Sequence, residues 1–155
     1  PGAKVEKGGF VGINDKSQPF ALEFKLVAPK LLVRSGADFL LPPVLQPSQL
    51  VRSLGAPPAR KHPYNVRQRR AKNDRIEARL GENFLIAKLP TNVKLEHPLA
   101  DYSLTYLHKD GKLIIERRLR VEPGTIAPAE FPAFLNLLQK ADAAEKERVV
   151  LQLKK

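Results

Sequence analysis

The sequence predicts a mainly β domain, an antiparallel β-sandwich with one amphipathic helix near its C-terminal end. First, Asp110-Gly111 separates two stretches of alternating apolar and polar residues, which is typical of a β-hairpin because glycine readily adopts the positive φ of a tight turn. Second, roughly eight to ten short apolar or alternating stretches are separated by proline and glycine. Third, the apolar residues after residue 130 recur at intervals of three and four, which indicates a helix.

The N-terminal part of the chain is expected to hold short strands. Residues 1–19 are rich in glycine and lysine and form at most a short strand, so we interpret them as an N-terminal extension or first strand. Residues 20–155 are interpreted as a single β-sandwich domain. Within it, residues 20–28 alternate between apolar and charged side chains, which predicts a half-buried strand. Two short apolar runs around Ser35-Gly36 favour a hairpin that ends at Pro42-Pro43, because proline cannot donate to a central ladder.

The middle of the chain alternates between loops and strands. Residues 46–58 contain three prolines and are expected to form a loop with one helical turn over Gln49–Ser53. The basic stretch 60–79 should end in a strand, because residues 76–79 alternate between apolar and charged side chains. Two further apolar runs, each followed by a proline, predict short strands over residues 84–89 and 93–95.

The hairpin of residues 99–121 contains one unusual residue, Arg117. The second arm places four apolar residues on one face, and Arg117 falls between two of them. A buried arginine is costly unless it is paired, so we expect Arg117 to bind an acid structurally or to contact a neighbouring domain, and structural pairing is favoured. The apolar residues of the two arms are Tyr102, Leu104 and Tyr106, and Leu113, Ile115, Leu119 and Val121.

The C-terminal part predicts a helix and a strand. The helix is expected over about residues 130–146, with Pro132 in its first turn, where the missing N–H would be unpaired anyway. Asp142 and Glu145 have the spacing of a capping box, which indicates that a second helical turn restarts there. Residues 149–153 are partly β-branched and predict the final strand.

The composition bounds the chemistry of the chain. A length of 155 residues with 43% apolar residues fits a single globular core. The chain contains no cysteine, which excludes a disulfide framework, a cysteine zinc site and a thiol nucleophile within it. No apolar run approaches the roughly 18 residues that would span a bilayer. The chain starts with proline, and we expect it to be an excised fragment or a mature form.

The strong basic charge suggests contact with a polyanion. The net charge is +11 and the sequence pI is about 10.1, which suits an anionic glycan, lipid or nucleic acid. The favoured explanation is solubility, together with a charge bias that other domains of a longer chain offset. The candidate contacts lie in the stretch RQRRAK, and nucleic acid is not favoured because only Tyr64 is near as a stacking platform. These candidate residues are Arg67, Arg69, Arg70 and Lys72.

No catalytic, metal or cofactor site is predicted. The chain has neither a G-x-S-x-G motif nor a glycine-rich phosphate loop. The histidines His62, His97 and His108 have no chelating spacing, and each is expected in a loop. An acid–base pair among Asp101, Asp110 and Glu116 is rejected, because the turn explains Asp110 and an exposed strand face explains Glu116.

The segment from Arg60 onward resembles the C-terminal region of bacterial transglutaminase-like proteins, which are large chains with a β-rich N-terminal domain, a central transglutaminase-like domain and a closing β-domain. The matching pieces are ARKHPY, then DRIEARLGENFLIAKLPTNVKLEHP, and then YSLTYLHKDGKLIIERRLRVEPGTIAPAEFPAFLNLLQKAD followed by VVL. The segment AEFPAF…L…AD is the most specific of them.

The resemblance implies an immunoglobulin-like β-domain without catalysis of its own. In that family the catalytic Cys, His and Asp lie in the central domain, so no catalytic residue carries over. The resemblance therefore implies an accessory module of a transglutaminase-like or cysteine-protease-like protein, with the neighbouring domains as partners. It also implies the periplasm or cell envelope as location, with the cytoplasm left open. The alternative is an independent basic module that binds anionic glycan, lipid or nucleic acid.

Overall fold

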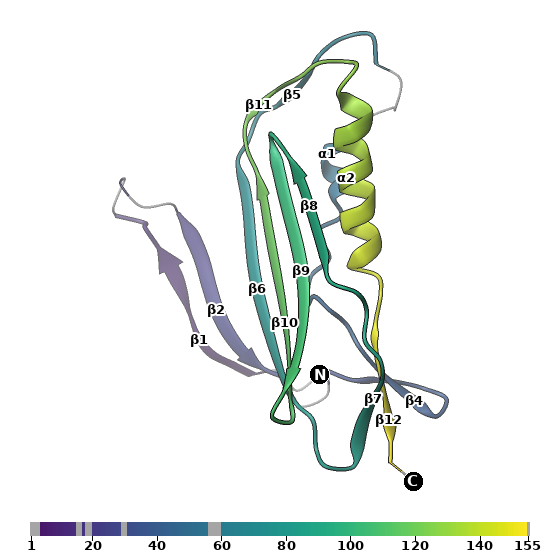
Figure 1. Cartoon of the computed structure of the whole chain (residues 1–155). Coiled ribbons are helices and arrows are strands. Elements are labelled where there is room, and N and C mark those ends of the chain that lie inside the picture. The colour runs from purple at the N-terminus through teal and green to yellow at the C-terminus, as the bar shows by residue number, and fades with distance from the viewer. Residues whose placement is uncertain (1–3, 15–16, 18–19, 29–30, 56–59, 155) are drawn as a thin grey trace. The chain divides into compact units, whose positions relative to one another are not determined.

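The chain divides into two compact units, Pro1–Val33 and Arg34–Lys155. The computed structural model describes residues 4–14, 17, 20–28, 31–55 and 60–154. In the first unit, β1 (Lys4–Val11) and β2 (Ala21–Val27) form an antiparallel hairpin with a register irregularity near Val5 (Figure 1). The sequence placed a boundary near residue 20, whereas the structural division lies between Val33 and Arg34.

The first unit is amphipathic. The predicted strand over residues 20–28 is present, but Leu22 and Phe24 are more than half exposed instead of half-buried. Phe10 lies opposite Leu22 and stacks on Phe20, with their ring centroids 5.5 Å apart. A two-stranded hairpin buries little apolar surface by itself, which explains this exposure.

The second unit contains ten further strands and two helices among the described residues. Three antiparallel sheets form, in the strand orders β6-β10-β9-β8, β3-β4-β12-β7 and β11-β5. The elements are β3 (Val33–Ser35), β4 (Asp38–Leu41), α1 (Leu50–Leu54), β5 (Tyr64–Val66), β6 (Arg70–Arg79), β7 (Phe84–Lys88), β8 (Val93–His97), β9 (Ala100–Lys109), β10 (Lys112–Val121), β11 (Gly124–Ile126), α2 (Phe131–Ala144) and β12 (Val149–Leu153).

The predicted hairpin forms the centre of the main sheet. Asp110 and Gly111 turn the chain between β9 and β10, with φ angles of 51° and 70°. Ile115 lies opposite Tyr106 of β9 and Ile76 of β6, so both neighbours of β10 present apolar residues to the same face. Strand β8 pairs with the other side of β9 and completes the four-stranded sheet. The alternation in the sequence therefore predicted which side chains point inward.

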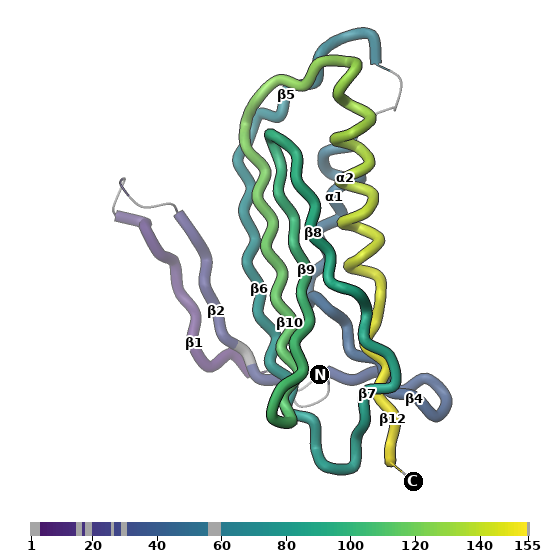
Figure 2. Tube along the Cα trace, in the orientation of Figure 1, coloured from purple at the N-terminus to yellow at the C-terminus, as the bar shows by residue number. Residues whose placement is uncertain are grey.

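Helix α2 covers the inner face of this sheet. Figures 1 and 2 show α2 running beside β8 and leading directly into β12, and α2 contacts both β8 and β9. The side chains of α2 that repeat at three and four are buried against the sheet, as the apolar spacing predicts. The largest fully buried apolar side chains of the unit are Tyr102, Phe131, Phe134, Leu41, Leu50, Leu104, Leu113, Ile115, Ile126, Leu138 and Leu151.

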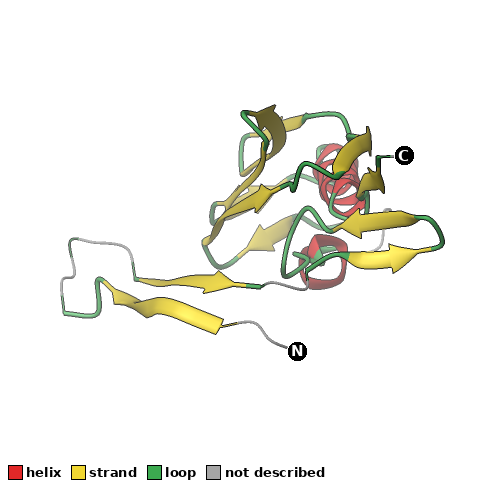
Figure 3. Ribbon diagram, turned by 90° about the horizontal axis from the view of Figure 1, so that it is seen from below, coloured by secondary structure: helices red, strands yellow, loops and turns green. Residues whose placement is uncertain are grey.

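The predicted class is confirmed as mainly β with antiparallel sheets and a helix near the C-terminal end. Figure 3 shows the two helices among a majority of strands. The predicted helical turn near residue 50 is present as α1, and the predicted hairpin around Gly36 is present as β3 and β4. The layers of the second unit are consistent with a sandwich-like arrangement, in which α2 leads into β12 of the second sheet. The immunoglobulin-like topology stays a prediction.

Candidate functional site

The four predicted basic residues do not form one patch. Arg67 and Arg69 are exposed in the segment between β5 and β6, and the Arg69 Nε donates to Glu122 Oε2 at 2.7 Å. Arg70 and Lys72 lie in β6, are half-buried, and stand in register with Val121 and Leu119 on the inner side of the sheet. The strand alternation therefore separates these cations, and an ion pair already occupies Arg69.

The outer face of the central sheet carries several surface ion pairs. Arg75 of β6 bonds to Glu77 at 2.9 Å and also to Glu116 of β10. Further along β10, the Arg120 Nε donates to Asp101 Oδ2 at 2.8 Å. These side chains are all substantially exposed, and such pairs contribute little to stability individually. Because these strands are paired in register, the charged side chains stand at fixed positions on this face.

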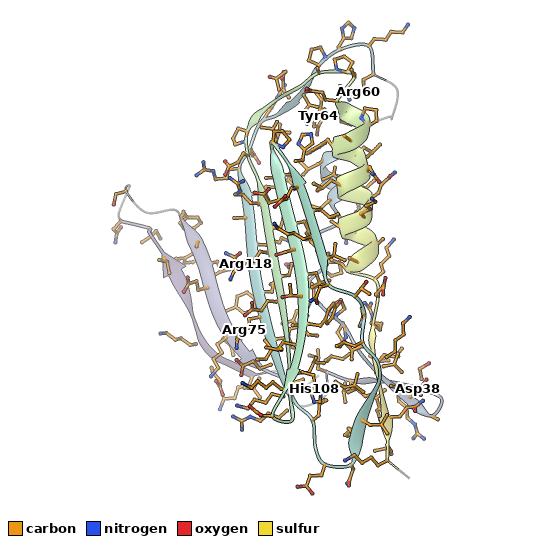
Figure 4. The ribbon with its side chains drawn as sticks, viewed as in Figure 1. Asp38, Arg60, Tyr64, Arg75, His108 and Arg118 are labelled. Carbon is orange, nitrogen blue, oxygen red and sulfur yellow. The ribbon has the colours of Figure 1, made fainter. Side chains whose placement is uncertain are left out.

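Arg118 stands without a partner in the middle of this pattern. It lies opposite Asn73 of β6 and Ser103 of β9, and among the described residues it forms no ion pair or hydrogen bond. Figure 4 shows Arg118 and Arg75 projecting from the same side of the sheet. The three residues Asn73, Ser103 and Arg118 line an open depression of about 360 Å³ together with Lys94 and Arg120. An exposed arginine flanked by an amide and a hydroxyl is suited to bind a carboxylate.

Arg117, in contrast, belongs to the interior. Its side chain is 1% exposed and is paired with Asp74 and with Glu145, the latter at 2.8 Å. The Arg117 Nη1 also donates to the Gln46 carbonyl at 3.1 Å and to Ser48 Oγ at 2.9 Å. The prediction of structural pairing is confirmed. Arg117 holds the segment before α1 against β6, β10 and the end of α2.

The two acids at the end of α2 fasten α1 and do not restart a helix. Asp142 accepts from the backbone N–H groups of Leu50 and Val51 at 2.8 and 2.9 Å, which satisfies two donors at the start of α1. Glu145 accepts from the Ser48 N–H at 2.6 Å and from its hydroxyl at 2.8 Å. The capping-box interpretation was wrong, because α2 continues through Asp142 and both carboxylates point to a distant segment.

Two tyrosine hydroxyls are buried on the inner face. Tyr102 and Tyr106 are 1% and 7% exposed, and neither hydroxyl has a hydrogen-bond partner among the described residues. The Tyr102 hydroxyl lies near the Glu145 carboxylate without reaching hydrogen-bond geometry. Burial raises the pKa of Tyr106 to about 12, and it also raises the pKa of Tyr102. Both phenols are therefore neutral near pH 7.

Two of the three histidines lie in strands. His97 ends β8 and His108 lies in β9, so the expectation of loop positions was wrong for both. The His97 Nδ1 accepts from the Leu99 N–H at 3.1 Å, its ring packs on Phe134, and burial lowers its pKa. Within the described ranges no group of three or more His, Asp or Glu side chains could hold a metal ion.

Polar side chains at the end of the sheet near β5 are also engaged. The Arg60 guanidinium lies over the Tyr64 ring (Figure 4), 4.9 Å from its centroid. The Tyr64 ring meets the Phe131 ring edge-on. Arg60 lies over the Phe131 ring as well. These contacts tie β5 to the start of α2 and assign Arg60 a packing role.

The chain belongs to the family described as "Domain of Unknown Function with solved-structure structure (DUF3858)", whose model matches residues 38–151. The chain is also similar to a crystal structure from Parabacteroides distasonis described as a "putative protease", with a TM-score of 0.51 and 12% sequence identity. At this identity the match shows the fold alone, and it covers 64% of this chain and 19% of the other. No curated protein matches this chain. Among the described residues, no helix is long and apolar enough to cross a membrane.

Proposed function

We propose that this chain is a non-catalytic accessory domain of a larger transglutaminase-like or cysteine-protease-like protein. Three observations support the proposal. The chain lacks cysteine, the nucleophile of such enzymes. Its buried tyrosines are neutral and its most buried histidine packs on Phe134. The similar crystal structure, described as a "putative protease", is much longer than the region that matches this chain.

The observation that carries the proposal is the outer face of the central sheet, where Arg118 has no ion pair among the residues that the structure describes. Other guanidiniums of this face are neutralised within the sheet, such as Arg75 and Arg120. Arg118 keeps its full hydrogen-bonding capacity beside Asn73 and Ser103. We propose that this face contacts a neighbouring domain of the parent protein and that Arg118 binds one of its carboxylates.

The proposed location is the periplasm or cell envelope. It rests on the resemblance to transglutaminase-like parents, which are usually exported. A fusion of the parent protein to a reporter that is active only after export tests it, and a stably produced fusion without reporter activity would contradict it.

The accessory role is tested with the catalytic domain that we expect in the same reading frame. The chain alone should show no peptidase or transferase turnover, and it should bind the separately produced catalytic domain. The Arg118→Gln variant should bind more weakly. The variant Lys140→Gln is the matched control, because it removes the same charge from an exposed position on α2. Turnover by the chain alone that disappears on substitution of one polar residue would overturn the accessory role.

The second candidate is a basic module that binds an anionic polymer of the envelope. It is favoured by the net charge of +11 and by cations without an ion pair among the described residues, such as Arg67. Binding to heparin or to anionic vesicles at two salt concentrations separates the two functions. Salt-sensitive binding supports the polymer-binding function, and its absence removes that candidate.

A further inference from the structure

We propose that the free edge of β6 binds an extended acidic segment of another protein, which adds a fifth strand to the central sheet. This interaction surface is distinct from the outer face that carries Arg118. It goes beyond the accessory role, because it holds for the isolated chain whatever the parent protein does.

The first argument is the length and regularity of the edge. β6 stands at the end of the order β6-β10-β9-β8. It pairs with β10 at ten consecutive positions, from Arg70 opposite Val121 to Arg79 opposite Lys112, without a register shift. No strand among the described residues pairs with its other side. In an antiparallel edge strand about half of the backbone N–H and C=O groups point away from the sheet, ready to pair with an added strand.

The other sheet edges of the second unit lack these features. β8 and β7 have five residues each and β3 has three. The ladder between β7 and β12 also contains a register irregularity. β6 contains neither proline nor glycine, so it has none of the devices that bend an edge or remove its donors. It is therefore the edge best able to accept a strand.

The second argument is the charge along β6. Its two acids are already engaged, since Asp74 pairs with Arg117 and Glu77 pairs with Arg75. Arg70, Lys72 and Arg79 form no ion pair in the part of the chain that the structure describes. The unmatched charge along the edge is therefore positive on both faces of the sheet. Cross-strand pairs of opposite charge stabilise a ladder, so the complementary strand is acidic.

The third argument concerns the middle of the edge. Ile76 is 8% exposed and Ala78 is half-buried, both on the inner side. An added strand would extend this apolar surface if it carried an apolar residue beside them. The expected segment thus carries acids near its ends and an apolar residue near its centre. A second copy of the chain fits less well, because two chains of net charge +11 repel each other.

The test uses a blocked ten-residue peptide with glutamates at adjacent positions near both ends, so that acids stand on both faces, and with valine and threonine in its middle. Two control peptides accompany it, one with glutamine in place of glutamate and one with N-methyl groups along one backbone edge. We expect saturable binding of the acidic peptide to the full chain with a dissociation constant below about 1 mM. In hydrogen exchange, protection should rise in the segment of β6 and remain unchanged in β8.

Paired substitutions in the chain test the charge argument. Lys72→Gln with Arg79→Gln should weaken peptide binding about two- to thirty-fold, because each removes a cross-strand ion pair. Lys140→Gln with Lys146→Gln is the matched control, since it removes the same charge from exposed positions at and beyond the C-terminal half of α2. Unchanged thermal melting of both variants confirms that they fold.

Several outcomes would overturn the proposal. Equal binding of the glutamine peptide would remove the charge argument, and binding of the N-methylated peptide would exclude strand addition. Protection outside β6, or no binding at all, would exclude this edge as the site. Self-association in sedimentation that the acidic peptide does not reverse would assign the edge to a second copy of the chain.

Discussion

Replacement of Arg117 by leucine tests how much the buried ion pairs of Arg117 stabilise the second unit. The guanidinium is 1% exposed and lies against two carboxylates of different environments. Glu145 is 1% exposed, whereas Asp74 is 32% exposed and can be hydrated after the change. Arg117→Leu thus leaves one fully buried carboxylate without a cation, although Ser48 still donates to it twice.

The expected cost follows from that buried carboxylate. Removal of one partner of a buried ion pair typically destabilises a protein by about 3–5 kcal/mol. For a unit of this size, that corresponds to a fall in melting temperature of roughly 10–20 °C. The exposed pair of Arg120 and Asp101 provides the matched control, and Arg120→Leu should cost at most about 1 kcal/mol.

Urea unfolding followed by circular dichroism measures both variants. The double variant Arg117→Leu with Glu145→Leu should be more stable than Arg117→Leu alone, because it removes the stranded charge. If Arg117→Leu costs no more than Arg120→Leu, or if the second substitution brings no recovery, the account of this buried cluster is refuted.

Three further predictions concern single groups. Asp142→Ala should destabilise the chain by about 0.5–2 kcal/mol in urea unfolding, because α1 loses the acceptor of two N–H groups, while Asp142→Asn should cost less. The pKa of Tyr106 is about 12 in the folded chain and about 10 in the unfolded chain. The free energy of unfolding should therefore be unaffected below pH 10 and should fall by up to about 1.4 kcal/mol per pH unit between pH 10 and 12. A melting temperature that stays constant between pH 10 and 12 would argue against this pKa. The lowered pKa of His97 affects stability at acidic pH, because the unfolded chain binds the proton more readily than the folded chain. Stability should therefore decrease as the pH falls below about 6.5, and His97→Gln should reduce that dependence in melts at pH 7 and pH 5.

Local patterns in the sequence predicted the central part of the fold. Alternation assigned the inner and outer faces of β9 and β10, and Asp110-Gly111 located their turn. The three- and four-residue spacing located α2, and the position of Arg117 among apolar residues predicted its pairing. These features succeeded because each depends on residues close together in the chain.

Features that depend on distant residues were missed. β5 and β11 are three residues long and pair over about sixty positions, which no local pattern predicts. Asp142 bonds to residues more than ninety positions away, so its spacing from Glu145 suggested a local cap instead. β6 begins at Arg70, inside the charged stretch, because pairing with β10 overrides weak strand propensity.

The candidate surface was only partly predictable. The sequence pointed to Arg67, Arg69, Arg70 and Lys72 because charge density is visible without a structure. Arg118 lies on the outer face, and its isolation depends on which acids the neighbouring strands place beside Arg75 and Arg120. Strand register, which the sequence does not specify alone, therefore decides which cation stays unpaired.

The most direct test of the accessory role is a calorimetric titration of this chain into the catalytic domain that we propose for the same reading frame. The account predicts saturable binding that weakens in Arg118→Gln and remains unchanged in Lys140→Gln. The loss should be at least about ten-fold, because a charge-assisted hydrogen bond contributes about 1.5–3 kcal/mol. Absence of binding, or equal binding by both variants, would contradict the claim that the outer face of the sheet holds a neighbouring domain.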